Sequence, residues 1–176
     1  DHKGESKGIL GVTGGNLSYK PQDSKLKKAI QYEIGPNYFV YPGFVNGHDH
    51  LLGNYFSRVG RGPYINWLPW DNDLKAAKVY QERGKLTNYE IYQLACLKHL
   101  ISGVTWVSDH IPHVVNDKFI PHMPIHVISR YTLAHEVSSY DLKWGDPKTE
   151  HAKAQKENMP FVTHIEEGFD EEAMKG

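Results

Sequence analysis

The stretch Tyr41-Pro42-Gly43-Phe44-Val45-Asn46-Gly47-His48-Asp49-His50 joins a short apolar run to two histidines separated by one residue. On a β-strand, side chains two residues apart point to the same face, so His48 and His50 can direct both imidazoles at one point while Asp49 faces the other side. Neutral imidazole is the commonest metal ligand in proteins. The pattern therefore predicts two metal ligands at the end of a strand, and its alternative is a pair of loop histidines with no ligand role.

Two later apolar runs also end in polar residues. One ends in Ser108-Asp109-His110, and the other ends in His164, with Glu167 three residues further on. His164 is therefore a candidate third ligand. Glu167 would then be a proton carrier, because a carboxylate near a metal site can accept a proton and return it to a leaving group. In the alternative interpretation, Glu167 only solvates the start of a helix and His110 only caps its strand. His113 could line the same pocket as His110, and His135 is a weaker candidate of the same kind.

Capping residues, turns and apolar spacing predict a β-rich opening followed by alternating strands and helices. We expect extended runs at residues 8–13, 29–34 and 38–45, a turn at 11–16, strands at 104–109, 125–129 and 160–165, a helix over 88–101, and helices that begin at 146–147 and 170–172. Such alternation favours a mainly parallel sheet with helical crossovers, as in doubly wound sheets and (β/α)₈ barrels.

The composition favours a globular domain that binds neither nucleic acid nor a membrane. The 176 residues include 20 basic and 21 acidic side chains, so no excess positive charge is present to bind phosphates. The single cysteine, Cys96, has no partner for an internal disulfide, and no apolar run is long enough to cross a bilayer. We therefore expect a cytoplasmic protein, and we expect Cys96 and Trp106 in its core.

Residues 42–50 resemble the first barrel strand of the metal-dependent amidohydrolase superfamily, which carries Pro-Gly-Phe, a hydrophobic residue, Asn or Asp, and His-x-His. Two further motifs follow in the family's order: residues 102–110 are similar to its second strand, and residues 164–168 to its strand-five His-x-x-Glu. Within this superfamily, the chain looks most like the deaminases and chlorohydrolases that act on nucleobase-like rings. Residues 8–41 are similar to part of the small β-sandwich domain that precedes the barrel.

The resemblance implies an α/β fold of two parts. Residues 1–41 would be part of a β-sandwich domain, and residues 42–176 the N-terminal part of a distorted (β/α)₈ TIM barrel of the amidohydrolase type. The site of such a barrel lies at the C-terminal ends of its strands.

The resemblance also implies a site and a reaction. His48, His50 and His164 would bind one divalent ion, Zn²⁺ or Fe²⁺, and Glu167 would move a proton. The implied reaction is hydrolysis of a non-peptide carbon–nitrogen bond, such as deamination of a heterocyclic or amide-like small molecule.

The chain departs from the family pattern in its length. A (β/α)₈ barrel takes roughly 250 residues, and the family's strand-six histidine and strand-eight aspartate do not occur before Gly176. We therefore expect a longer polypeptide to supply the missing C-terminal half of the barrel. A non-catalytic metal-binding or assembly fragment is the alternative to an active hydrolase, and a doubly wound binding module with incidental histidines is a third hypothesis. A one-metal site is preferred, although Lys143 stays open as a carbamylated bridging ligand.

Residues after the first predicted strand are candidates for substrate contacts. Tyr55, Arg58, Arg61 and Trp67 lie in the loop that follows it, where they could contact a planar ring or pack against a neighbouring subunit of a homo-oligomer. We expect Trp67 and His110 to contact the substrate. The histidines without a matching context are assigned to the surface or to packing: His2, His99, His122, His126 and His151.

Overall fold

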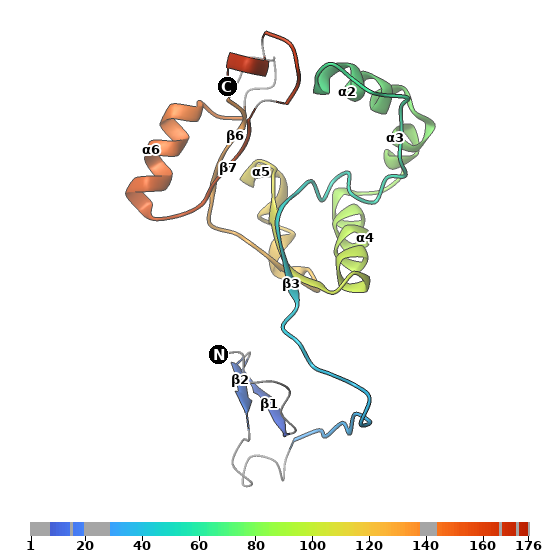
Figure 1. The fold of residues 1–176 in the computed structure, drawn as a ribbon, viewed down its shortest axis with the longest axis vertical. Coiled ribbons are helices and arrows are strands. Elements are labelled where there is room, and N and C mark those ends of the chain that lie inside the picture. The colour runs from blue at the N-terminus through green and yellow to red at the C-terminus, as the bar shows by residue number, and fades with distance from the viewer. Residues whose placement is uncertain are drawn as a thin grey trace. The chain divides into compact units, whose positions relative to one another are not determined.

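The computed structural model describes residues 8–14, 16–19, 29–137, 144–165, 167–171 and 173–175, and the contacts divide the chain into two units, Asp1–Tyr41 and Pro42–Gly176 (Figure 1). In the first unit, β1 (Leu10–Thr13) and β2 (Asn16–Tyr19) pair antiparallel around Gly14, whose φ is +56°. The predicted turn is therefore confirmed. The β-sandwich domain stays an expectation.

Two predicted runs of the opening segment differ in the structure. The described residues 29–34 have no regular secondary structure, and the run predicted at 38–45 becomes a strand only at Phe44. A strand needs a neighbour that accepts and donates its backbone hydrogen bonds. Phe44 has one, because its N–H donates to the Gly103 carbonyl at 2.9 Å.

The second unit alternates strands and helices. Its elements are β3 (Phe44–Asp49), α2 (Trp67–Ala76), α3 (Lys78–Arg83), α4 (Asn88–Ile101), β4 (Val104–Asp109), α5 (His113–Asn116), the 3-10 turn η1 (Ile120–His122), β5 (His126–Val127), β6 (Thr132–Glu136), α6 (Pro147–Glu157), β7 (Phe161–His164) and the 3-10 turn η2 (Ala173–Lys175). The strands form two parallel sheets, β3-β4-β5 and β6-β7. Parallel pairing agrees with the alternation, but the described strands do not close into a barrel, and the barrel stays an expectation.

The helix boundaries follow from capping. At the start of α4, the Thr87 hydroxyl accepts from the Glu90 N–H and the Glu90 carboxylate accepts from the Thr87 N–H at 2.8 Å, which confirms the predicted capping box. Asp146 caps α6 and Pro147 is its first residue, also as predicted. The helix expected to begin at 170–172 is present as the short 3-10 helix η2, and the Asp170 carboxylate accepts from the Ala173 N–H at 3.0 Å. Residue 172 lies outside the described residues.

Helices α2 and α3 were not predicted, because the segment after β3 lacks a clear apolar period. Asn66 begins α2 by accepting a hydrogen bond from the Leu68 N–H at 2.9 Å. Pro69 lies in the first turn, where the missing N–H costs no helical hydrogen bond.

One face of the β3-β4-β5 sheet packs against α4 and forms the main core. The buried residues of this core are Leu51, Tyr92, Ala95, Cys96, Val107, Ile125 and Val127. The expected burial of Cys96 is confirmed. The expected burial of Trp106 is wrong: its side chain is on the other face of β4, is 47% exposed, and lies against the ring of His126 with 3.8 Å between centroids.

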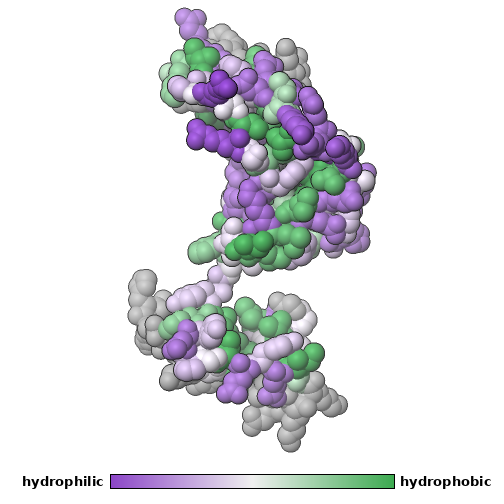
Figure 2. All heavy atoms as spheres, turned by 90° about the vertical axis from the view of Figure 1, so that its right-hand side faces the viewer, coloured by the Kyte–Doolittle hydropathy of each residue, from purple (hydrophilic) through white to green (hydrophobic). Residues whose placement is uncertain are grey.

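Apolar side chains remain exposed on the surface of this unit. Phe44, Val45, Leu97 and Ile101 are each at least half exposed, and Figure 2 shows green patches among polar atoms on the side where α2, α3 and α4 lie. None of the helices in the described part of the chain combines the length and the apolar character needed to cross a membrane.

Candidate metal centre

Two strands of the same sheet end in the same dipeptide, Asp-His. Asp49 of β3 pairs in register with Asp109 of β4, and the His110 N–H donates to the Asp49 carbonyl at 2.7 Å. His50 and His110 therefore leave neighbouring strands at the same level, with 5.2 Å between their ring centroids. Parallel strands bring their carboxyl ends to one edge, which is where such sheets carry their sites.

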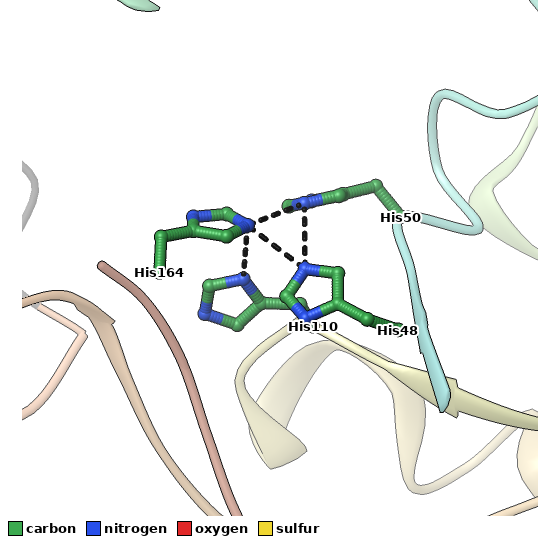
Figure 3. Close-up of side chains that lie close together, drawn as sticks. All are labelled: His48, His50, His110 and His164. Carbon is green, nitrogen blue, oxygen red and sulfur yellow. Dashed lines mark hydrogen bonds between the residues drawn. The ribbon is translucent and has the colours of Figure 1, made fainter. Parts of the chain in front are cut away.

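Four imidazoles from three strands converge at this edge. His48 lies on β3, His50 and His110 directly follow β3 and β4, and His164 ends β7 (Figure 3). The Nε2 atoms of His48, His50 and His164 form a triangle with edges of 2.8, 3.1 and 3.4 Å. The four nitrogens, including Nδ1 of His110, lie within 4.8 Å of one another.

The triangle has the dimensions of a metal-binding site. Ligand nitrogens on a tetrahedral zinc with bonds of about 2.0–2.1 Å lie about 3.3 Å apart. The structure thus brings together His48, His50 and His164, the three residues expected as ligands. It also adds His110, which was expected at the substrate.

The tautomer of His110 follows from its contacts. Its Nε2 lies 2.8 Å from the Ala134 carbonyl oxygen, which can only accept, so Nε2 carries the proton. Its Nδ1 therefore presents a lone pair, and this atom lies 3.2 Å from Nε2 of His164. Loss of water around the ring lowers the pKa of His110 to about 3, against a weaker opposing effect of the Ala134 carbonyl.

The other imidazoles are also poised as neutral ligands. Loss of water around the ring, followed by the charges of His164 and His48, lowers the pKa of His50 to about 4. Loss of water and the neighbouring His164 likewise lower the pKa of His48. At neutral pH these rings hold lone pairs rather than positive charge, which is the form that binds a metal.

Two carboxylates, the partly buried Asp49 and the buried Asp109, support the ligand-bearing strand ends. Asp49 accepts from the His50 N–H at 2.6 Å and lies 3.1 Å from Nε2 of the buried His99. Asp109, 1% exposed, accepts from the Leu51 N–H at 3.0 Å and from the Tyr92 hydroxyl. Such partners behind a site orient its ligands. Sequence reasoning missed this role, although the repeated Asp-His at two strand ends was a usable signal.

Glu167 lies beside a ligand ring. Its Oε2 is 3.1 Å from Nδ1 of His164, without the linear geometry of a hydrogen bond. A carboxylate in this position favours the orientation that turns the opposite nitrogen toward a metal. Backbone hydrogen bonds hold Glu167 in place, because its carbonyl accepts from the Trp67 N–H at 3.1 Å. Two residues later, the Phe169 N–H donates to the Ile65 carbonyl at 2.7 Å.

A cavity of about 790 Å³ adjoins the histidines and has apolar walls. Its aromatic and aliphatic lining comes from Phe56, Trp67, Trp70, Leu74, Tyr80 and Trp144. The Trp67 indole is held in place by donating to Glu136 at 3.1 Å. Trp67 and His110 therefore lie where a substrate contact was expected.

The remaining candidate residues are divided between the cavity wall, where His135 and Arg58 lie, and positions outside the cavity. His113 is held by Asp117 at 2.7 Å and by the Tyr131 carbonyl at 2.9 Å, and His135 packs edge-on against Trp67 with 5.1 Å between ring centroids. Arg58 lines the cavity and Arg61 does not. Lys143 lies outside the described residues.

Comparison of the chain with protein-family models, with curated proteins and with solved structures found no match.

Proposed function

We propose that this chain carries the mononuclear metal centre of a hydrolase that acts on carbon–nitrogen bonds in small molecules. The observation that supports the proposal is the Nε2 triangle of His48, His50 and His164 beside a cavity of about 790 Å³. Catalytic zinc sites use three protein ligands and keep one position for water or substrate. Cavities of about 300–1,000 Å³ are typical of small-molecule sites.

Each group has a role in this proposal. The three Nε2 atoms would hold one Zn²⁺ or Fe²⁺, the divalent ions that suit imidazole ligands in hydrolytic sites. A bound ion supplies Lewis acidity, which polarises the substrate and makes water more acidic. Glu167 lines the cavity, accepts the proton of the attacking water and returns it to the leaving nitrogen, as in deamination of a heterocyclic or amide-like substrate.

A second candidate function is a non-catalytic metal site. It is favoured by Nδ1 of His110, whose lone pair is 3.2 Å from Nε2 of His164. If His110 completes a four-nitrogen coordination shell, the site is closed to water, as in structural zinc sites.

Metal binding is the first test. We expect the chelator-treated chain to take up one equivalent of Zn²⁺, measured by elemental analysis after dialysis. His48→Ala and His164→Ala should each lose the bound zinc. His122→Ala, outside the cluster, is the matched control. Full zinc retention by His48→Ala would contradict the proposal.

The open position is the second test. Loaded with Co²⁺, the chain should change its visible spectrum when azide is added, because azide can take a ligand position that no protein atom fills. An unchanged spectrum would favour the closed, non-catalytic site. Ammonia release from amino-substituted heterocycles, lost in Glu167→Gln with zinc retained, would support the hydrolase.

A further inference from the structure

The acidic groups of the cavity all have partners in the described structure. Asp71 pairs with Lys75 at 2.5 Å, and Glu167 contacts His164 at 3.1 Å. Asp49 is matched by His99, and Asp109 accepts hydrogen bonds, as described above. Among these contacts, the pair of Asp71 and Lys75 joins two opposite full charges. Lys75 is therefore already engaged, and Arg58 and Arg83 are the other lysine or arginine side chains in the described lining of the cavity.

Two arginines line the same cavity without an acidic partner among the described residues. Neither Arg58 nor Arg83 forms an ion pair with a described carboxylate, and both face the cavity that holds the histidine cluster. Nε of Arg83 is buried and has no hydrogen-bond partner in the part of the chain that the structure describes. The guanidinium of Arg83 lies over the Tyr80 ring, 5.6 Å from its centroid, a contact that positions the group without using its N–H donors.

An unpaired buried donor carries a desolvation cost that a ligand oxygen can remove. A guanidinium presents several N–H groups in one plane, and this arrangement matches the two oxygens of a carboxylate. Phe56, Trp67 and Trp144 line the same cavity and favour a flat apolar body, because aromatic rings stack or meet edge to face.

We propose that the substrate is a planar apolar molecule with an anionic substituent, a carboxylate or a group of the same shape and charge, which Arg83 binds with help from Arg58. The inference rests on the proposed hydrolase, since the reacting bond would lie toward the histidines of the same cavity. It adds the chemical class of the substrate and names the residues that select it.

Binding can be measured without chemistry at the metal. The full chain, treated with chelator so that no metal can hold a carboxylate, is titrated with naphthalene carboxylate and with its uncharged carboxamide. Quenching of tryptophan fluorescence reports occupancy. We expect the acid to bind at least about tenfold more tightly than the amide, the size of effect typical of a hydrogen bond to a charged group.

Variants assign the preference to a residue. Arg83→Gln should bring the affinity for the acid down to that for the amide and leave amide binding unchanged, and Arg58→Gln should reduce the preference in part. Arg130→Gln, at an exposed position outside this cavity, is the control. Circular dichroism verifies the fold, and Arg83→Lys, which keeps the charge, should retain part of the preference.

Equal affinity for acid and amide in the parent chain, absence of binding by either, or a preference that survives Arg83→Gln would each overturn the inference. Zinc stoichiometry separates it from the proposed function. If the chain binds no zinc but Arg83 still selects the acid, the hydrolase fails and the anion site stands. If zinc binds normally and the acid is not preferred, only the substrate class is wrong.

Discussion

Removal of one hydroxyl should weaken the buried network behind the metal centre. The Tyr92 side chain is fully buried, and its hydroxyl donates to Asp109, which is 1% exposed. In Tyr92→Phe, Asp109 keeps the donors Leu51 and Asn116, at 3.0 and 3.2 Å. Because the lost bond reaches a buried carboxyl group, we expect the free energy of unfolding to fall by about 1.5–3 kcal/mol at a pH where Asp109 is ionised in the folded chain.

The size of this loss should depend on pH. Burial raises the pKa of Asp109 above its ordinary value, and the hydrogen bond from Tyr92 is the largest effect that opposes the rise. When a carboxyl group has a higher pKa in the folded chain than in the unfolded chain, the protein becomes less stable as pH rises from the unfolded-state pKa through the folded-state pKa. Tyr92→Phe should raise the folded-state pKa of Asp109 further, so the free energy of unfolding of the variant should fall more than that of the parent over this pH range. Below the unfolded pKa the loss should shrink to that of a neutral hydrogen bond, about 1 kcal/mol.

Urea denaturation, monitored by circular dichroism at neutral and at acidic pH, measures the loss of unfolding free energy and its dependence on pH. Tyr89→Phe, on the same helix, is the control, because its hydroxyl forms no hydrogen bond with the described residues. A loss below about 0.5 kcal/mol at neutral pH, the level of an ordinary surface change, would refute the reasoning. A loss that stays the same in acid would show that the charge of Asp109 plays no part.

Three further outcomes are expected. Leu51→Ala should reduce the free energy of unfolding by about 2–5 kcal/mol in urea denaturation, since the side chain is fully buried in the core next to His50. A smaller loss would mean that neighbouring core side chains move in to fill the space left by the leucine. Hydrogen bonds from Thr87 lower the pKa of Glu90 below 4.5, so its stabilising effect is present above that pH and disappears as pH falls through the folded pKa. The melting temperature of Glu90→Gln should therefore be lower than that of the parent near neutral pH and equal to it in acid, and a constant gap would contradict this. Burial raises the pKa of the Cys96 thiol to about 12, so a thiol reagent should label Cys96 only after denaturation, and rapid labelling of the folded chain would show that the core is open.

Local patterns in the sequence were enough to place several elements. The capping box at Thr87 and Glu90 and the stop at Gly103 predicted α4 with its observed bounds, because helix ends depend on backbone groups satisfied by residues close in the chain. Alternation along β3 likewise predicted that His48 and His50 point to one side. These features depend on neighbours a few residues away.

Long-range packing decided the rest. His110 became a candidate ligand because its strand pairs in register with β3 and because the Ala134 carbonyl sets its tautomer. Trp106 is exposed because α4 covers only the opposite face of β4. Arg83 faces the cavity through the packing of α2 and α3, two helices with no clear period in the sequence. A residue's burial and partners depend on segments distant in the chain, so no local pattern encodes them.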